Sequence, residues 1–411
     1  MKNLWLYFGW MVLINGQLLA QEEDKKFFHR KNQSDSIMTI QESIYNRPFI
    51  TMGNTQTAIG GYLEGNTNYF KEDGISEGFS MELRRFNIFL YSTIIPRVRF
   101  ISELEFEHGT EEIELETALI DFELNPAFVI RAGILLPPIG RFNQNHDSPQ
   151  WEIIDRPFVS TQIIPSTLSE VGFGANGKFF KGQMIFTYDL YLVNGLGSGI
   201  VDNEFGRTDI QSGKNGERFA EDENGRPMLT GRIGLRHRKW GEIGISGYGG
   251  TYNNFELEGT KVAPKNKLSI FAVDFSLQIA KATVQGEYAL ANIDIAQDAS
   301  EQFGDKQWGG FAEVIYPVLK RQILGFPNSV INATVRLEKI DYNKGEFNNE
   351  DGLLDDLNIY DDLSAIVLGL GFRPSAGTIM RANYRYHWTR DFLGNPTIKT
   401  AGFQVGFATY F

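Results

Sequence analysis

The chain ends on the stretch Gly402-Phe403-Gln404-Val405-Gly406-Phe407-Ala408-Thr409-Tyr410-Phe411, and its alternation decides the fold. In an extended strand, successive side chains point to opposite faces, so Phe403, Val405 and Phe407 share one face. Small or polar residues, Gln404 among them, occupy the opposite face. This pattern predicts a β-strand that has one apolar and one polar environment.

The same alternation recurs in sixteen segments that Gly, Pro, Asn and charged residues separate. In the third segment, apolar Phe100 and Leu104 share one face, and acidic Glu103 and Glu105 share the other. The predicted strands are 56–66, 79–93, 97–108, 112–123, 127–135, 167–180, 183–194, 227–239, 242–253, 267–280, 281–293, 306–319, 329–342, 362–373, 377–390 and 397–411. The sequence therefore predicts an all-β fold.

The connections between these segments alternate between tight turns and longer polar stretches. The longer connections are roughly 67–78, 136–166, 195–226, 254–266, 294–305 and 343–361. A transmembrane barrel has short periplasmic turns, longer external loops, and strands that are apolar outside and polar inside. We therefore predict a transmembrane antiparallel β-barrel of about sixteen strands over residues 51–411, located in the cell outer membrane.

The N-terminal residues predict export. Residues 1–20 combine Lys2, an apolar run and Ala20, which is typical of a secretory signal peptide. After Ala20 no stretch is long and apolar enough for a transmembrane helix, so a membrane location requires a barrel. Residues 21–50 are polar with little periodicity, and we expect a solvated periplasmic lead-in there. The terminal Phe411 resembles the closing residue of Gram-negative outer-membrane barrels, which implies an assembly signal for the barrel assembly machinery.

Composition excludes several classes of function. The chain has no Cys, which removes disulfides, thiol catalysis and cysteine-ligated zinc. Its formal net charge of -12 offers no basic footprint for nucleic acid. The aromatic content of 13% and the 43 Gly suit a barrel of many short strands with aromatic belts.

Three short motifs carry a family resemblance. Met81–Phe86 (MELRRF), Arg131–Gly140 (RAGILLPPIG) and Tyr191–Gly195 (YLVNG) resemble, in order, three motifs of the phosphate-selective porin O and P family. In that family they form an RR strand, a GQ-x-x-x-P-x-G strand-to-loop junction and an FNG strand end. The resemblance implies a sixteen-stranded homotrimeric porin whose third external loop folds into the pore. It also implies an arginine ladder along the lumen and lysines on that loop.

Segment 136–166 is the third external connection by this count, and its prolines restrict its backbone. We expect it to fold inward and narrow a lumen that would otherwise be a wide aqueous channel. An external loop packed on the barrel rim is the alternative. The residues expected at the pore constriction are Arg141, Asn143, Asp147, Glu152, Asp155 and Arg156, with Gln144 and His146 among them.

Charged residues on the polar faces of the strands are expected to line the lumen. They are Arg85, Arg97, Arg99, Glu103, Glu105, Arg131, Arg232, Arg236, Arg238, Arg381 and Arg385. Because acids accompany the arginines and 136–166 contains no Lys, selectivity for phosphate does not follow from these residues. A transverse field, with acids on one wall and arginines on another, would favour dipolar or mixed small solutes.

The predicted function is an outer-membrane porin for passive diffusion of small hydrophilic solutes, with anions such as phosphate among the candidates. The expected partners are these solutes, outer-membrane lipid and lipopolysaccharide. We expect no cofactor, no metal and no enzymatic activity, because no nucleophile elbow or spaced His pair occurs. The alternatives are a substrate-specific channel, an outer-membrane barrel enzyme and a soluble secreted glycan-binding β-sandwich. The acidic loop 346–362 lacks the ligand spacing of a calcium loop.

Overall fold

The computed structural model describes residues 28–30, 39–52, 56–76, 78–214, 219–296, 304–344, 360–391 and 395–411. The predicted signal peptide and most of the acidic loop 346–362 lie outside these described residues. Within the described ranges, no helix is long and apolar enough to cross a membrane.

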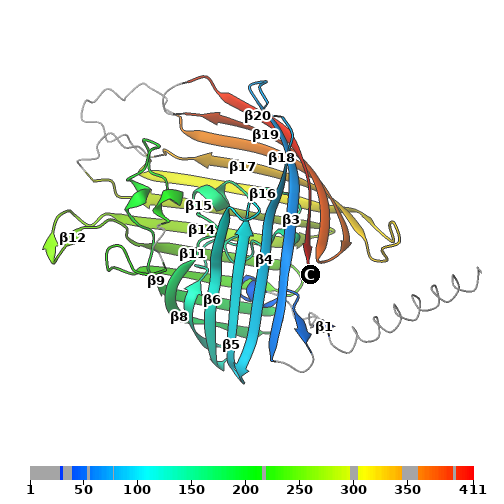
Figure 1. The fold of residues 1–411 in the computed structure, drawn as a ribbon, viewed down its shortest axis with the longest axis horizontal. Helices are drawn as coiled ribbons and strands as arrows, with labels where there is room; N and C mark the ends of the chain where they lie inside the picture. Colours follow the sequence, from blue (N-terminus) through cyan, green and yellow to red (C-terminus); the bar gives the residue numbers. More distant parts are fainter. Residues whose placement is uncertain are drawn as a thin grey trace, which may run out of the picture.

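Sixteen antiparallel strands form a closed barrel (Figure 1). Each strand pairs with the next barrel strand, and β20 returns to β3, where Tyr410 lies opposite Tyr62. The strands are β3 (Thr57–Glu72), β4 (Ser80–Ile95), β5 (Val98–Glu107), β6 (Glu112–Asn125), β7 (Phe128–Leu135), β8 (Glu170–Lys181), β9 (Met184–Val193), β10 (Met228–His237), β11 (Gly241–Thr251), β14 (Lys267–Ile279), β15 (Ala282–Ile293), β16 (Lys306–Lys320), β17 (Val330–Asp341), β18 (Asp362–Ser375), β19 (Thr378–Arg390) and β20 (Ile398–Tyr410). The predicted fold class is confirmed, because each predicted segment overlaps one of these strands.

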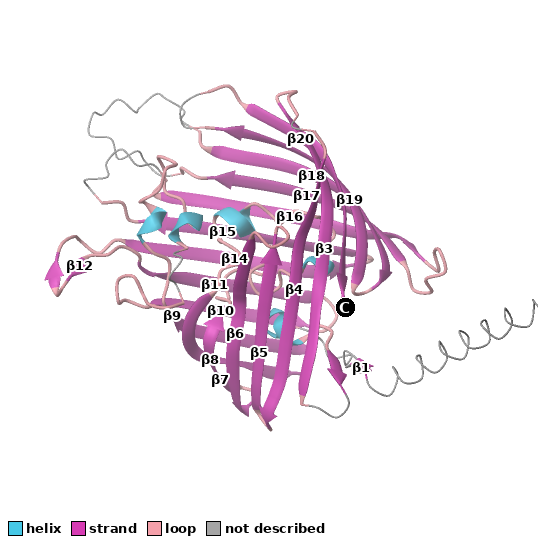
Figure 2. Cartoon of the chain, in the orientation of Figure 1, coloured by secondary structure: helices cyan, strands magenta, loops and turns pink. Residues whose placement is uncertain are grey.

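Tight turns join most of the strands at one end of the barrel, where the nine-residue connection 321–329 is an exception, and mostly longer connections join them at the other. We call these the turn end and the loop end. The connection at 108–111 is an exception, because it lies at the loop end and is short. The hairpin of β12 (Glu256–Leu257) and β13 (Thr260–Lys261) belongs to a loop-end connection. The short helical turns, drawn in cyan in Figure 2, lie in loop-end connections and in the N-terminal segment.

The strands are apolar outside and polar inside, as their alternation predicts. In β20, Phe403, Val405 and Phe407 are 60%, 56% and 42% exposed, whereas Gln404 between them is 4% exposed. On the other strands, large apolar side chains are likewise exposed at alternate positions, on the outer face of the barrel. Because water solvates such an apolar exterior poorly, the barrel belongs in the outer membrane, as the sequence predicts.

A β-bulge in β4 turns two adjacent arginines toward the lumen. Glu64 of β3 lies opposite Arg85, whereas the next residue, Gly65, lies opposite Leu83, so Arg84 is the extra residue of β4. Such an extra residue re-aims the side chains beside it. Arg84 and Arg85 therefore both contact groups inside the barrel.

A second bulge lies in β6. Glu103 of β5 is opposite Thr117, and Leu104 is opposite Leu115, so Glu116 is the extra residue. Both Glu116 and Thr117 are almost fully buried inside the barrel. The bulge thus adds a carboxylate to the inner face of β6.

The N-terminal segment also lies against the inner wall. β2 (Ile50–Met52) pairs with the start of β3 at the turn end, and β1 (Phe28–Arg30) pairs with β2. Before β2, residues Ile40–Tyr45 form the 3-10 helix η1, and the amide of Ile40 donates to Glu242 of β11 at 3.1 Å. The sequence predicts a solvated lead-in over 21–50. Within it, residues 39–50 differ from this prediction, because several of their side chains are buried among inward-facing wall residues.

Candidate functional site

The connection between β7 and β8 packs against the inner wall through its backbone. Glu287 of β15 accepts a hydrogen bond from the amide of Arg141 at 2.6 Å, and Glu338 of β17 accepts one from the amide of Phe158 at 2.6 Å. Glu287 and Glu338 are buried on the inner faces of their strands. Strand carboxylates therefore hold the loop at two separated points.

Arg381 of β19 is a third anchor for this loop. Its guanidinium donates to the carbonyl oxygens of Ser148, Trp151 and Ile153 at 3.2, 2.9 and 3.1 Å. The same guanidinium pairs with Glu64 of β3 at 2.8 Å. A buried guanidinium has five N–H donors, so it can satisfy several loop carbonyls that would otherwise require water. Arg381 thus joins the loop to β19 and to β3, the two strands on either side of β20.

A cavity of about 620 Å³ lies between this loop and strands β4 to β6. Its lining combines wall strands, the loop after β7 and the loop before β10. The charged lining residues are Arg84, Arg85, Glu105, Glu107, Glu112, Glu114, Glu116, Asp155, Arg156, Lys214 and Arg385. We call this space the outer cavity, because external loops form part of its boundary.

Charges are separated across the outer cavity. Most of its acids belong to β5 and β6, and its basic residues come from β4, β19 and the loops. Arg85 pairs with Glu105 and Glu107 at 3.2 and 2.5 Å. Glu112 and Glu114, at the start of β6, are exposed. One side of the cavity therefore carries an excess of carboxylates.

Asp155 connects the basic strands to the loop. Its carboxylate lies 2.7 Å from Arg84 of β4 and 3.0 Å from Arg385 of β19. Burial alone would raise the pKa of Asp155, but Arg385 and Arg84 outweigh burial and hold the pKa below its usual range. Asp155 is therefore an anion at neutral pH and offsets part of the charge of both arginines.

A second cavity, of about 300 Å³, lies toward the turn end, and we call it the inner cavity. Its charged lining residues are Glu42, Arg99, Asp121, Glu123, Arg131 and Lys178. Arg131 donates to both oxygens of Asp121 at 2.7 and 2.8 Å, and Tyr45 of η1 donates to the same carboxylate. The N-terminal segment therefore forms part of this second cavity.

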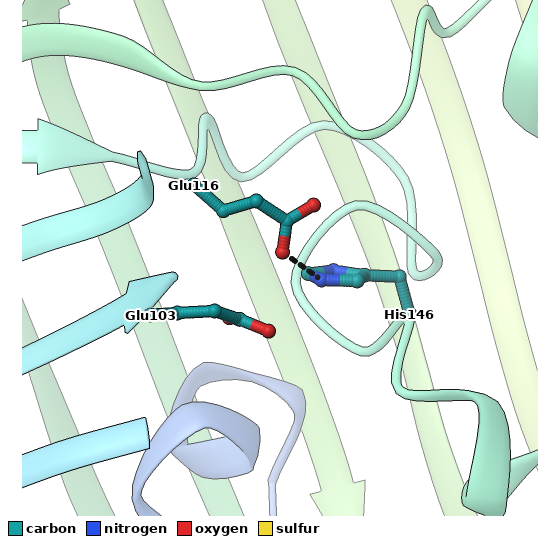
Figure 3. A group of neighbouring side chains, drawn as sticks. All are labelled: Glu103, Glu116 and His146. Atoms are coloured by element: carbon teal, nitrogen blue, oxygen red, sulfur yellow. Dashed lines mark hydrogen bonds and ion pairs between the residues drawn. The ribbon is translucent and has the colours of Figure 1, made fainter. Parts of the chain in front are cut away.

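Glu103, Glu116 and His146 converge inside the barrel, with ligand atoms within 4.8 Å of one another (Figure 3). Their oxygens and nitrogens already have partners. Glu103 accepts from Asn87 at 2.7 Å and pairs with Arg47 at 2.8 Å. Nε2 of His146 lies 3.1 Å from Glu116, and Nδ1 lies 3.0 Å from the Asn143 carbonyl oxygen.

Carboxylate and imidazole are suitable metal ligands, but here a cation would have to displace Arg47 from Glu103. We therefore describe the group as an ion-paired junction. His146 is 2% exposed, so it does not lie at an exposed outer rim, where a barrel enzyme would need its catalytic residues.

The six residues predicted at the constriction divide into two groups. Asp155 and Arg156 line the outer cavity. The other four are buried or half-buried and hold the loop in place. Asn143 donates to the Pro137 and Leu168 carbonyls and joins the two ends of the loop.

Asp147 accepts from Arg47 and from Tyr410 at the end of β20. Glu152 accepts from Arg373 of β18 at 2.6 Å. The Arg141 side chain lies near the charged residues of β10, β11 and β14, away from the outer cavity.

The residues predicted to line the lumen mostly face inward. Arg85, Glu105 and Arg385 line the outer cavity, and Arg99 and Arg131 line the inner cavity. Arg232 is buried between Asp274 and Glu242, and Arg236 lies 3.8 Å from Glu242.

Arg97 and Arg238 differ from this prediction. Both are exposed in tight turns rather than on strands, and Arg97 has a φ of 72° directly after Pro96. The alternation of the adjacent strands does not extend into these turns, so it cannot predict the direction of their side chains.

Sequence reasoning missed several inward-facing arginines, among them Arg373 of β18, which donates to Glu152. Arg84 is re-aimed by the bulge, and the adjacent Arg-Arg pair before an outward Phe86 was the available signal. Arg336 of β17 is buried against Glu313 at 2.7 Å and follows the ordinary alternation of its strand. Arg47 lies in a segment without periodicity, so no sequence pattern indicates its position.

Comparisons with known proteins support the porin class. No family model matches the chain. An uncharacterized protein of Aquifex aeolicus (strain VF5) is 33% identical over 146 residues, which are 34% of this chain and 32% of that protein. The chain therefore spans about a third of the length of this curated relative.

Solved structures of Gram-negative outer-membrane porins share the fold at low identity. An anion-selective porin from Comamonas acidovorans has a TM-score of 0.52 at 11% identity, with 86% of this chain and 99% of that chain covered. The outer membrane channel DcaP of Acinetobacter baumannii has a TM-score of 0.54 at 10% identity, with coverages of 86% and 97%. Salmonella typhi OmpF, in complex with daunomycin, has a TM-score of 0.53 at 10% identity, with the same coverages. The resemblance to the phosphate-selective porin O and P family stays a prediction.

Proposed function

We propose that this protein is an outer-membrane porin that lets small hydrophilic solutes diffuse passively through the outer cavity. The observation that carries this proposal is the charged space of about 620 Å³ inside a sixteen-stranded barrel, bounded by a loop on the inner wall. We further propose that loop 136–166 forms the constriction, with Asp155 and Arg156 in contact with the passing solute.

The charges of the outer cavity favour dipolar solutes. Six lining residues are acidic and five are basic, so the net charge of the lining is close to zero. A nearly balanced lining with separated acids and bases aligns a molecule that carries both charges, whereas it gives a phosphate ion little net attraction. We propose small zwitterions, such as free amino acids, as better permeants than anions of the same size. Assembly as a homotrimer stays a prediction.

Proteoliposome swelling tests the solute class. We expect liposomes with the purified protein to swell faster in a small neutral zwitterion than in an anion of similar size. Glu112→Lys and Glu114→Lys together should reverse this order, because they replace two carboxylates of the acidic side by cations. Arg97→Glu in a tight turn is the matched control and should leave the order unchanged. Equal swelling rates for both solutes in all variants would contradict the proposed selectivity.

A further inference from the structure

We propose that residues 39–49 form an internal plug, held by Arg47, that separates the outer cavity from the inner cavity and limits passage between them. This inference rests on the proposed function, in which solutes cross the barrel. In this proposal the N-terminal segment narrows the lumen together with the loop after β7.

The plug begins at η1, which contacts widely separated strands. Besides the Ile40 contact with β11, the side-chain amide of Gln41 donates to the Tyr188 carbonyl oxygen of β9 at 2.8 Å and to Asp189 at 3.1 Å. Tyr45 donates to Asp121 of β6, and Ser43 donates to the Gln144 carbonyl oxygen of the loop. This short 3-10 helix therefore contacts the wall between β6 and β11 and also the loop.

Arg47 ties the plug to both the wall and the loop. Its Nε and one terminal nitrogen donate to the two oxygens of Asp147 at 2.9 and 2.6 Å. The other terminal nitrogen lies 2.8 Å from Glu103 of β5, and the guanidinium stacks over Phe89 of β4, 4.0 Å from the ring centroid. Arg47 is 4% exposed. A bidentate and a single ion pair at one buried guanidinium fix its position in three dimensions.

The position of Arg47 along the barrel explains why it would obstruct the lumen. On β5, Arg99 lines the inner cavity and Glu105 lines the outer cavity, and Glu103 lies between them. Among the described residues, the linings of the two cavities have no member in common. Arg47, with Glu103 and Asp147, occupies the layer between the cavities.

The plug is attached at the turn end, where β2 continues into β3. Ion pairs and hydrogen bonds provide many of its contacts with the wall, and removal of the whole segment opens a polar space in which water can solvate the wall residues that it contacted. The barrel strands close through their own ladder and do not depend on η1 for pairing. We therefore expect the barrel to fold without the plug.

Single-channel recording in planar bilayers tests the plug. Deletion of residues 39–47 should raise conductance at least about twofold, because it widens the narrowest layer. Arg47→Ala should raise conductance or produce frequent transitions to a larger open level. Arg47→Lys should restore part of the original level, because lysine keeps the positive charge but not the bidentate geometry of the guanidinium. Deletion of residues 22–27 is the control and should leave conductance unchanged. Unchanged conductance in the 39–47 deletion would contradict the plug.

Thiol labelling gives a test that does not depend on conduction. The chain has no Cys, so single cysteines can be introduced at Gln162, which lines the outer cavity, and at Glu123, which lines the inner cavity. A bulky charged thiol reagent is added to whole cells of a host without general porins. Gln162→Cys should react with and without the plug. Glu123→Cys should react only after deletion of 39–47 or in Arg47→Ala.

These two experiments distinguish the possible failures. Equal labelling of Glu123→Cys with and without the plug would overturn the plug, whatever the conductance. If Glu123→Cys reacts only when the plug is removed but no variant conducts, the plug is supported and passive diffusion as the function is overturned. Heat-modifiable migration in detergent gels should verify that each variant forms a folded barrel.

Discussion

The guanidinium of Arg84 lies 2.7 Å from the carboxylate of Asp155, and this contact joins a bulge in the barrel wall to the loop after β7. Without the bulge, the strict alternation of a strand would turn one of the two adjacent arginines, Arg84 or Arg85, outward. Because of the bulge, Arg84 forms an ion pair with the loop while the adjacent Arg85 forms ion pairs with the acids of β5.

The first prediction concerns the charge at this contact. Asp155→Asn removes an anion from between Arg84 and Arg385 and leaves two cations on the cavity wall. The reversal potential in a salt gradient should move toward anion selectivity, measured on the fraction of Asp155→Asn protein that forms a folded barrel. Arg97→Gln, which removes a charge from an exposed turn, is the control and should leave the reversal potential unchanged. A shift toward cations in Asp155→Asn would contradict the assignment.

The second prediction is a pH dependence. The pKa of Asp155 is lowered in the folded state, so its ion pairs contribute stability above the unfolded-state pKa and lose it only as pH falls through the folded-state pKa. The difference in reversal potential between the native protein and Asp155→Asn should therefore stay constant from about pH 8 to about pH 5. Measuring both proteins across this range checks the sign, and a difference that disappears near pH 5 would refute it.

The third prediction concerns Arg381. Arg381→Met should destabilise the protein by about 3–5 kcal/mol, because it leaves buried Glu64 with Arg85 as its remaining arginine partner and removes the donors for three loop carbonyls. Adding Glu64→Gln should recover part of the loss, since the second change removes a buried carboxylate that has lost one of its two arginine partners. Denaturant unfolding in lipid or detergent measures both variants. A double variant that is less stable than the sum of the two single changes would argue against this pairing.

The fourth prediction concerns the phase of β20. Phe407→Arg should cost roughly 2–4 kcal/mol if the residue lies near the bilayer midplane, because its side chain faces lipid. An arginine at Gln404, which is turned inward beside polar Asn68, should be tolerated better. Refolding yields into lipid vesicles compare the two, and equal damage at both positions would show that the phase is wrong.

The alternation of strands such as β20 was sufficient to predict the barrel, because each strand separates lipid from a polar interior along its whole length. The bulges at Arg84 and Glu116 depend on the register with the neighbouring strand, which alternation within one strand does not predict; the adjacent Arg84 and Arg85 were the available signal for the first bulge. The loop composition identified Asp155 and Arg156 but could not separate them from Asn143 and Asp147, since all four are polar and only tertiary contacts distinguish their roles. Arg47 was missed because its partners lie far away in the chain.

Single-channel current through purified Gln162→Cys protein, recorded before and after addition of a charged thiol reagent, tests the central claim most directly. Gln162 lines the outer cavity, and the chain offers no native cysteine to complicate the reaction. The proposed porin predicts stable open steps that fall to a smaller level when the reagent reacts, while the cysteine-free protein is unaffected. Open steps that keep their size after complete labelling, or a folded barrel that never conducts, would contradict passive diffusion through this cavity.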